Sequence, residues 1–120
     1  MQTFRFLSFP VYLESKSFYF LAITISKTFS RPYWELADQL QRAALSVILN
    51  IAEGSAKGSD KDFNRYIEIS LGSINECLAC CDIAADHKLI STKQFTDMRQ
   101  KAEEIAKQLG GFSKKLCEKK

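Results

Sequence analysis

The chain has few of the residues that catalytic and metal sites require. It contains a single histidine, His87, so no convincing Ser-His-Asp set can be assembled and zinc ligands are scarce. The adjacent acids Glu103 and Glu104 point in different directions on a helix, which argues against a pair of catalytic carboxylates. Residues 55–59 lack the Walker spacing and a preceding strand, so we interpret them as a connector rather than a phosphate loop. We therefore expect a protein that is not an enzyme and has no cofactor.

A long apolar run is also missing. The most apolar stretch, residues 17–25, is far shorter than the about 20 residues that a membrane-spanning helix needs. Pro10, Glu14 and Lys16 interrupt what would be the core of a signal peptide. With two prolines, five glycines and no low-complexity segment, the 120 residues have the composition of one ordinary globular domain. We therefore expect a cytoplasmic protein with no membrane partner.

Cysteine is present, but its pattern does not favour a metal or redox site. Cys77 and Cys80 have CxxC spacing, and Cys81 follows directly. A redox CxxC uses the first turn of a helix, whereas these residues fall in the middle of a predicted helix. We interpret the three thiols as small core or interface side chains in a reducing compartment, with no metal bound.

Apolar residues recur at spacings of three and four along most of the chain, which is typical of amphipathic helices. The predicted fold is all-α, an up-down-up-down antiparallel four-helix bundle that assembles into an oligomer. An N-terminal arm, residues 1–9, is expected to be either loose or packed across a neighbour. The single bundle covers residues 10–120, with helices at about 10–29, 34–53, 60–87 and 92–116.

The first predicted helix is apolar on two faces. Tyr12, Tyr19 and Ile23 form a second stripe beside the one that faces the core, which is more apolar surface than a lone bundle can bury. These three residues are therefore the candidates for an oligomer interface. A β-strand over residues 18–25, which are rich in β-formers, is the alternative, although no partner strand is visible elsewhere.

Residues at the predicted helix ends have expected roles. Gly54 is expected to end the second helix in a left-handed conformation, and Ser59 to cap the third. Glu53 lies at the negative end of the helix dipole, which disfavours a carboxylate there. We therefore expect a structural salt bridge from Glu53 to Arg65 or Lys61 across the turn.

Three glycines fall inside predicted helices. Gly72 is expected to allow close packing against the alanines of the preceding helix, and a tolerated surface glycine is the alternative. Gly110 and Gly111 lie inside the apolar seam of the last helix. That helix either continues through them or ends at Leu109.

Charge is distributed unevenly along the chain. A net charge of +3 is too small to imply nucleic-acid binding by itself, but the first and last segments are basic and the third helix is acidic. The basic side chains are candidate phosphate contacts, and a solvated helix face is the alternative. The candidates are Lys16, Lys27, Arg31, Lys93, Arg99, Lys101, Lys107, Lys114 and Lys115.

Three segments of the sequence, LADQLQRAALS at 36–46, NIAEG at 50–54 and GSINE at 72–76, resemble one known family. It is the bacterial four-helix bundle family, also called the 23S rRNA intervening-sequence protein family. That family is similar to the accessory variability determinant of diversity-generating retroelements. Gln41 stands where a basic residue is common in the family. The structural signature residues in this chain are Asn50, Glu53, Gly54, Gly72 and Glu76.

The resemblance implies a homopentamer and, for the retroelement branch, binding to nucleic acid and to a reverse transcriptase. Two functions remain open on this basis. The first is a non-enzymatic oligomeric scaffold associated with RNA or DNA. The second is a structural or protein-interaction module that binds no nucleic acid, for example a reverse-transcriptase accessory protein.

Overall fold

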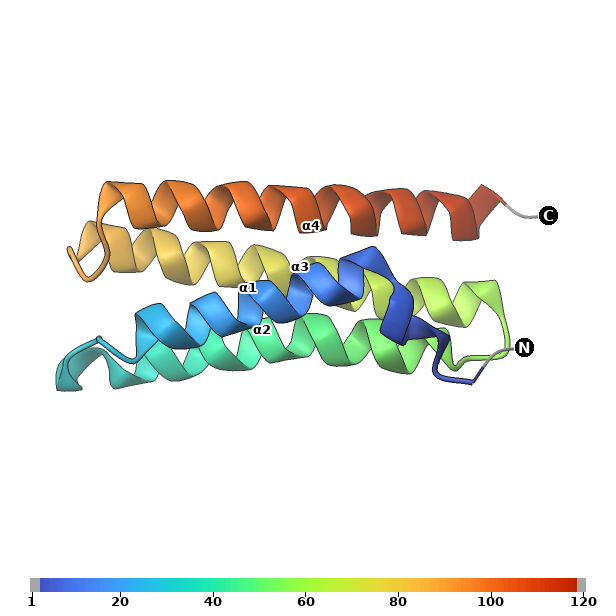
Figure 1. Ribbon diagram of the computed structural model, residues 1–120, viewed down its shortest axis with the longest axis horizontal. Coiled ribbons are helices and arrows are strands. Elements are labelled where there is room, and N and C mark those ends of the chain that lie inside the picture. The colour runs from blue at the N-terminus through green and yellow to red at the C-terminus, as the bar shows by residue number, and fades with distance from the viewer. Residues whose placement is uncertain (1–2, 119–120) are drawn as a thin grey trace.

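The computed structural model describes residues 3–118, which form four long helices and two short 3-10 turns (Figure 1). The prediction of an all-α four-helix protein is confirmed, since the stretch considered as a strand lies within a helix. The helices are α1 (Pro10–Ser26), α2 (Trp34–Ser55), α3 (Asp60–Asp86) and α4 (Thr92–Glu118), and the turns are η1 (Arg5–Ser8) and η2 (Arg31–Tyr33).

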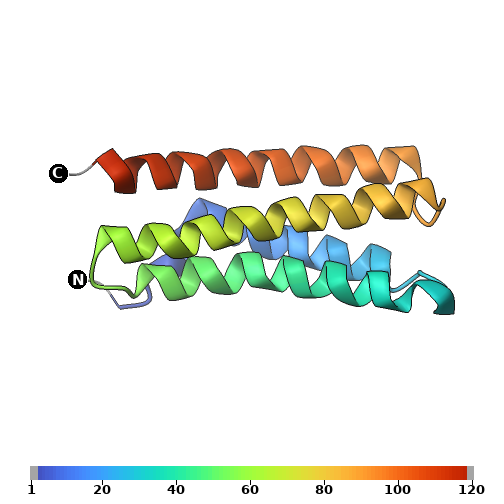
Figure 2. The same ribbon diagram turned by 180° about the vertical axis from the view of Figure 1, so that it is seen from behind.

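Consecutive helices run in opposite directions, and each packs along the next (Figures 1 and 2). α1 and α4 contact each other less extensively than the other neighbouring helices do. All four helices contribute to one apolar core, in which Phe18, Leu40, Ile67 and Ile105 are fully buried. The resulting molecule is long and narrow, with extents of 48 × 22 × 20 Å.

The starts of three helices follow from local chemistry. Pro10 occupies the first position of α1, where its missing N–H is not needed. The Ser59 hydroxyl caps α3 by accepting a hydrogen bond of 3.1 Å from the Asp62 N–H. At α4, Ser91 and Gln94 form a reciprocal capping box, with bonds of 3.0 and 2.8 Å.

The helices end within three residues of the predicted positions, and α2 and α3 end at Ser55 and Asp86 rather than at 53 and 87. α1 ends at Ser26 rather than at 29, because residues 27–29 form a turn in which the Phe29 N–H donates to the Ser26 carbonyl at 3.1 Å. Phe29 nevertheless stays buried, so the apolar period continues beyond the helix. α4 is helical through Gly110 and Gly111 to Glu118, and Lys119 and Lys120 of the predicted bundle lie outside the described residues.

The N-terminal arm packs on its own bundle, so the prediction of a loose arm was wrong, whereas packing across a neighbour stays a prediction. An Arg5 guanidinium N–H donates to the Ser55 carbonyl at the end of α2, at 3.1 Å. The same guanidinium lies 5.3 Å from the Phe63 ring centroid and 5.8 Å from that of Phe9. Cation–π contacts and one hydrogen bond therefore hold the arm in place. Met1 and Gln2 lie outside the described residues.

Candidate functional site

The signature residue Gly54 lies in close contact with α3. A Cβ atom on Gly54 would lie 2.7 Å from the Tyr66 Cβ and 2.9 Å from a ring carbon of Phe63. Its backbone does not have positive φ, and α2 continues past it to Ser55. The prediction of a left-handed helix end was therefore wrong. Glycine is required here because a side chain would collide with α3.

Gly72 is exposed to solvent, whereas close packing against the preceding helix was predicted. It is exposed on α3, and an added Cβ would meet no atom within 4 Å. The prediction of close packing against alanines was wrong, and the alternative of a tolerated surface glycine describes the residue.

Hydroxyl groups join α2 to α3 along the middle of the bundle. The Ser70 hydroxyl donates to the Val47 carbonyl at 3.0 Å, and the Ser73 hydroxyl donates to that of Ser46 at 2.9 Å. The Asn50 side-chain amide donates to both the carbonyl and the hydroxyl of Ser46, at 2.9 and 3.0 Å. Asn50 thus fixes a hydroxyl that the neighbouring helix uses, and this role is structural.

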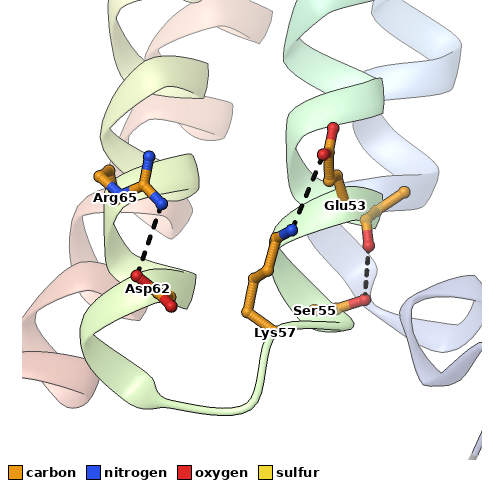
Figure 3. Close-up of polar contacts among 6 residues, drawn as sticks. Glu53, Ser55, Lys57, Asp62 and Arg65 are labelled. Atoms are coloured by element: carbon orange, nitrogen blue, oxygen red, sulfur yellow. Dashed lines mark hydrogen bonds and ion pairs between the residues drawn. The ribbon is translucent and has the colours of Figure 1, made fainter.

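Glu53 has a different partner from the two predicted (Figure 3). Its carboxylate lies 3.9 Å from the Lys57 ammonium, whereas Arg65 pairs with Asp62 on its own helix at 3.5 Å. Lys57 is one helical turn away from Glu53, and its ammonium also lies 5.0 Å from the Tyr66 ring centroid. With the Glu53 side chain 59% exposed, this pair contributes at most about 1 kcal/mol to stability.

The thiols on α3 are buried in the core. Burial raises the pKa of Cys77, Cys80 and Cys81 above the usual value, and the pKa of Cys81 reaches about 12. The charge of the exposed Glu76 raises the pKa of Cys77 and Cys80 further. Thiols held protonated in this way are poor nucleophiles and poor metal ligands. Within residues 3–118, no three His, Cys, Asp or Glu side chains are grouped to hold a metal ion.

The candidate basic residues on α4 are distributed around an exposed helix of mixed charge. Lys93 pairs with Asp97 at 3.3 Å and Arg99 with Glu103 at 3.2 Å. Lys101 borders a shallow groove between α1 and α4 that also carries two acids. Lys107 is exposed on the same helix. These side chains do not form a single basic surface.

The remaining candidates lie in separate places. Lys114 and Lys115 are exposed near the end of α4, where Lys115 lines a recess of about 530 Å³ with Arg5 and the acids Asp60 and Glu118. The Lys16 ammonium lies 5.1 Å from the Tyr12 ring centroid on α1. Lys27 and Arg31 lie in the connection between α1 and α2, at the opposite end of the bundle from the recess (Figure 1).

We call that opposite end the linker end and define it as residues 27–34 and 86–93. The Tyr33 hydroxyl and the His87 Nδ1 are 3.3 Å apart, with ring centroids at 5.4 Å, so the two connections are in contact. The Arg31 guanidinium lies 5.1 Å from the ring centroid of Trp34, which is 57% exposed. Neither Tyr33 nor Trp34 was predicted as a site residue from the sequence. The signal was available, because the first and third connections of an up-down-up-down bundle lie at the same end.

A groove between α1 and α2 has a volume of about 630 Å³ and almost entirely apolar walls. We call it the α1–α2 groove, and its residues are Lys16, Tyr19, Phe20, Ile23, Leu45 and Ile48. Phe20 is 70% exposed, and Leu49, one turn from Leu45, is 54% exposed. Of the predicted interface residues, Tyr19 and Ile23 are in this groove. Tyr12 packs edge-on against Phe6 of the arm instead, at 5.0 Å.

Leu45 in the wall of the groove and the neighbouring Leu49 were not predicted as interface residues from the sequence. Leu45 and Leu49 are one helical turn apart and lie away from the core stripe of α2, which was the available signal. Nearby, the Gln41 side-chain amide donates to the buried Ser26 hydroxyl of α1 at 2.9 Å. Gln41 therefore joins the two helices instead of adding charge.

No helix within residues 3–118 is long and apolar enough to cross a membrane.

Four antiparallel helices around one apolar core define an all-α four-helix protein. The chain belongs to the 23S rRNA-intervening sequence protein family, whose model matches residues 8–111. This confirms the family predicted from the sequence, whereas the likeness to the retroelement accessory proteins stays a prediction.

The fold is similar to the crystal structure of a protein of unknown function from the S23 ribosomal protein family of Bacteroides thetaiotaomicron. The TM-score is 0.78 at 22% sequence identity, and the match covers 87% of this chain and 98% of that chain. This likeness shows the fold alone. No curated protein matches the sequence.

Proposed function

We propose that the protein is a non-enzymatic scaffold that assembles from several copies and associates with nucleic acid. The α1–α2 groove is the observation that supports self-assembly most directly. It joins exposed apolar residues of two helices, Phe20 from α1 and Leu45 from α2, into one surface, and the exposed Leu49 lies one helical turn from Leu45. Contiguous apolar surface of this kind marks interaction sites in soluble proteins. A homopentamer, as the family resemblance implies, would cover the groove in every copy.

Association with nucleic acid is supported by basic side chains that the chain does not neutralise. Lys27 and Arg31 are exposed and form no ion pair within residues 3–118. Phosphate contacts need no fixed motif, and their effect on affinity grows with the number of charges neutralised. An oligomer repeats each cation in every copy, so a modest charge per chain becomes a substantial one.

Self-assembly through the groove is tested by Phe20→Glu, with Ile83→Glu as the matched control. Both residues are exposed apolar side chains, 70% and 45% exposed, but Ile83 lies on α3 and not in the groove. The Phe20 variant should lower the molar mass measured by light scattering toward that of one chain, because a buried carboxylate at an interface is costly. The control should keep the wild-type mass. Equal masses for wild type and both variants would contradict the proposed interface.

Nucleic-acid association is tested by the fluorescence anisotropy of labelled 20-nucleotide RNA and DNA strands mixed with the protein. The dissociation constant should rise steeply between about 50 and 200 mM salt, because bound cations release counterions from the phosphates. Absence of binding to RNA and DNA at 50 mM salt would contradict this part of the proposal.

The second candidate function is a protein-interaction module that binds no nucleic acid. The observation that favours it is the neutralisation of α4 cations by acids of the same helix, in the pairs Lys93–Asp97 and Arg99–Glu103. The groove would then serve assembly alone, and the partner class that the resemblance implies is a reverse transcriptase. Self-assembly without nucleic-acid binding in the two experiments above would select this function.

A further inference from the structure

We propose that the linker end holds a single-stranded nucleic acid, with one base stacked on Trp34 and phosphates beside Lys27, Arg31 and Lys88. This inference rests on the proposed association with nucleic acid and assigns it to one surface. The surface is assembled by the fold, since its two segments are more than 50 residues apart in the sequence and meet at Tyr33 and His87.

Trp34 is the only tryptophan of the chain and the first residue of α2. More than half of its surface is exposed, although a large aromatic ring is usually buried when the fold can cover it. The Arg31 guanidinium lies over the ring, 5.1 Å from its centroid, and more than half of the tryptophan remains exposed. Aromatic rings presented in this way are the platforms on which proteins stack single-stranded bases.

The cations around the ring are available to bind phosphates. Lys27, Arg31 and Lys88 are exposed and form no ion pair within residues 3–118. Residues 27–34 contain no acid, and residues 86–93 contain one, Asp86. Glu35 is the next acid along α2. The local excess of positive charge complements a phosphate backbone.

Lys88 also occupies a backbone position where glycine is usual. Its φ is 60°, and it follows the cap residue of α3 in a Schellman motif, in which the Leu89 N–H donates to the Ala84 carbonyl at 2.9 Å. Glycine would adopt this conformation with less strain. The fold therefore does not require lysine here, whereas a phosphate contact uses its charge.

A single strand fits this surface better than a duplex. Bases inside a duplex are stacked on one another and cannot reach the exposed face of Trp34, whereas unpaired bases can. The rings of Tyr33 and His87, whose centroids are 5.4 Å apart, lie at the same end of the bundle as Trp34. The linker end therefore presents rings and cations together, which is the combination that single strands require.

The intrinsic fluorescence of Trp34 reports on this site without a label. We would titrate wild type with 12-nucleotide single strands of RNA and of DNA, and with the corresponding duplexes, at 50 mM salt. The single strands should quench the emission and bind more tightly than the duplexes. The strand that binds with the higher affinity, RNA or DNA, identifies the natural class of ligand.

Affinities of variants for a labelled single strand complete the test. Trp34→Leu should weaken binding about tenfold, because stacking of one base is lost. Arg31→Gln and Lys88→Gly should each weaken it about threefold and reduce its salt dependence. Phe4→Leu and Lys61→Gln remove an exposed ring and an exposed cation from the opposite end of the bundle and should leave binding unchanged. Far-ultraviolet circular dichroism checks that every variant is folded.

The outcomes separate this inference from the proposed function. If a single strand binds tightly without quenching the fluorescence, or binds the Trp34→Leu variant as tightly as wild type, the assignment of binding to the linker end is overturned. The proposed association with nucleic acid would then still hold. Equal affinity for single strands and duplexes would also overturn the inference. Absence of binding to every nucleic acid at 50 mM salt would overturn both.

Discussion

At the scale of single residues, the surroundings of a glycine decide whether the fold needs it. Gly54 and Gly72 both belong to the family signature, and both lie inside helices. At Gly54 a Cβ atom would collide with Tyr66 and Phe63, whereas at Gly72 it would reach only solvent. A sequence shows both residues as interruptions of a helical pattern, because the distance to the neighbouring helix is not encoded in the pattern.

The two glycines should therefore respond in opposite directions to the same change. Gly54→Ala should lower the free energy of unfolding by about 1–3 kcal/mol, because α2 and α3 must separate to admit the methyl group. Gly72→Ala should raise it by up to about 1 kcal/mol, since alanine favours the helix and meets no atom. Urea denaturation of both variants measures these changes. Destabilisation of equal size at both positions would contradict the close approach at Gly54.

The buried thiols should make stability depend on pH in alkaline solution. The folded chain holds the Cys81 proton up to a pKa of about 12, whereas the unfolded chain releases it near the ordinary value of 9.0. The thiol therefore favours the folded state fully below pH 9, and this contribution is lost as the pH rises from 9 toward 12. The slope can reach about 1.4 kcal/mol per pH unit for each such thiol.

Urea denaturation at a series of pH values between 8 and 11, under reducing conditions, checks this expectation. Cys81→Ala should lose stability less steeply with rising pH than wild type does, although its stability at pH 8 is lower because a core side chain is truncated. Cys117→Ala, which removes an exposed thiol, should keep the wild-type slope. Identical slopes for all three proteins would contradict a thiol held protonated by burial.

At the scale of elements, the apolar period predicted all four helices but not all of their ends. The end of α1 was missed because Phe29 stays in the core after the backbone has turned at residues 27–29. The apolar period therefore extends to Phe29, although the helix itself ends at Ser26. Capping gave better boundaries, since Ser59 bonds an orphan N–H of α3 as its sequence context predicted.

Pairings between elements were harder to predict than the elements themselves. Glu53 was expected to reach a cation on α3, but Lys57 lies nearer along the chain and Arg65 is engaged by Asp62. The arm was expected to be loose or packed across a neighbour, but Arg5 contacts the Ser55 carbonyl and the Phe63 ring of its own bundle. Such choices depend on which side chains the packing brings together, and helical periodicity does not contain that information.

At the scale of the whole molecule, the topology decides which candidate residues can act together. The predicted basic residues lie in the first and last segments of the sequence, and the fold scatters most of them along α4 and over both ends of the bundle. The connection that holds Lys27 and Arg31 meets the connection between α3 and α4 through Tyr33 and His87, whose side chains are 3.3 Å apart. The predicted apolar face of the first helix is present in Tyr19 and Ile23, and α2 supplies the other wall of the groove.

One bundle leaves the α1–α2 groove uncovered, and we propose that sister copies cover it. Native mass spectrometry of the wild-type protein, at micromolar concentration in a volatile buffer, measures this most directly. The main species should be a multiple of the 13.6 kDa chain, with five copies as the family resemblance implies. A spectrum containing only the 13.6 kDa monomer at every concentration would contradict it.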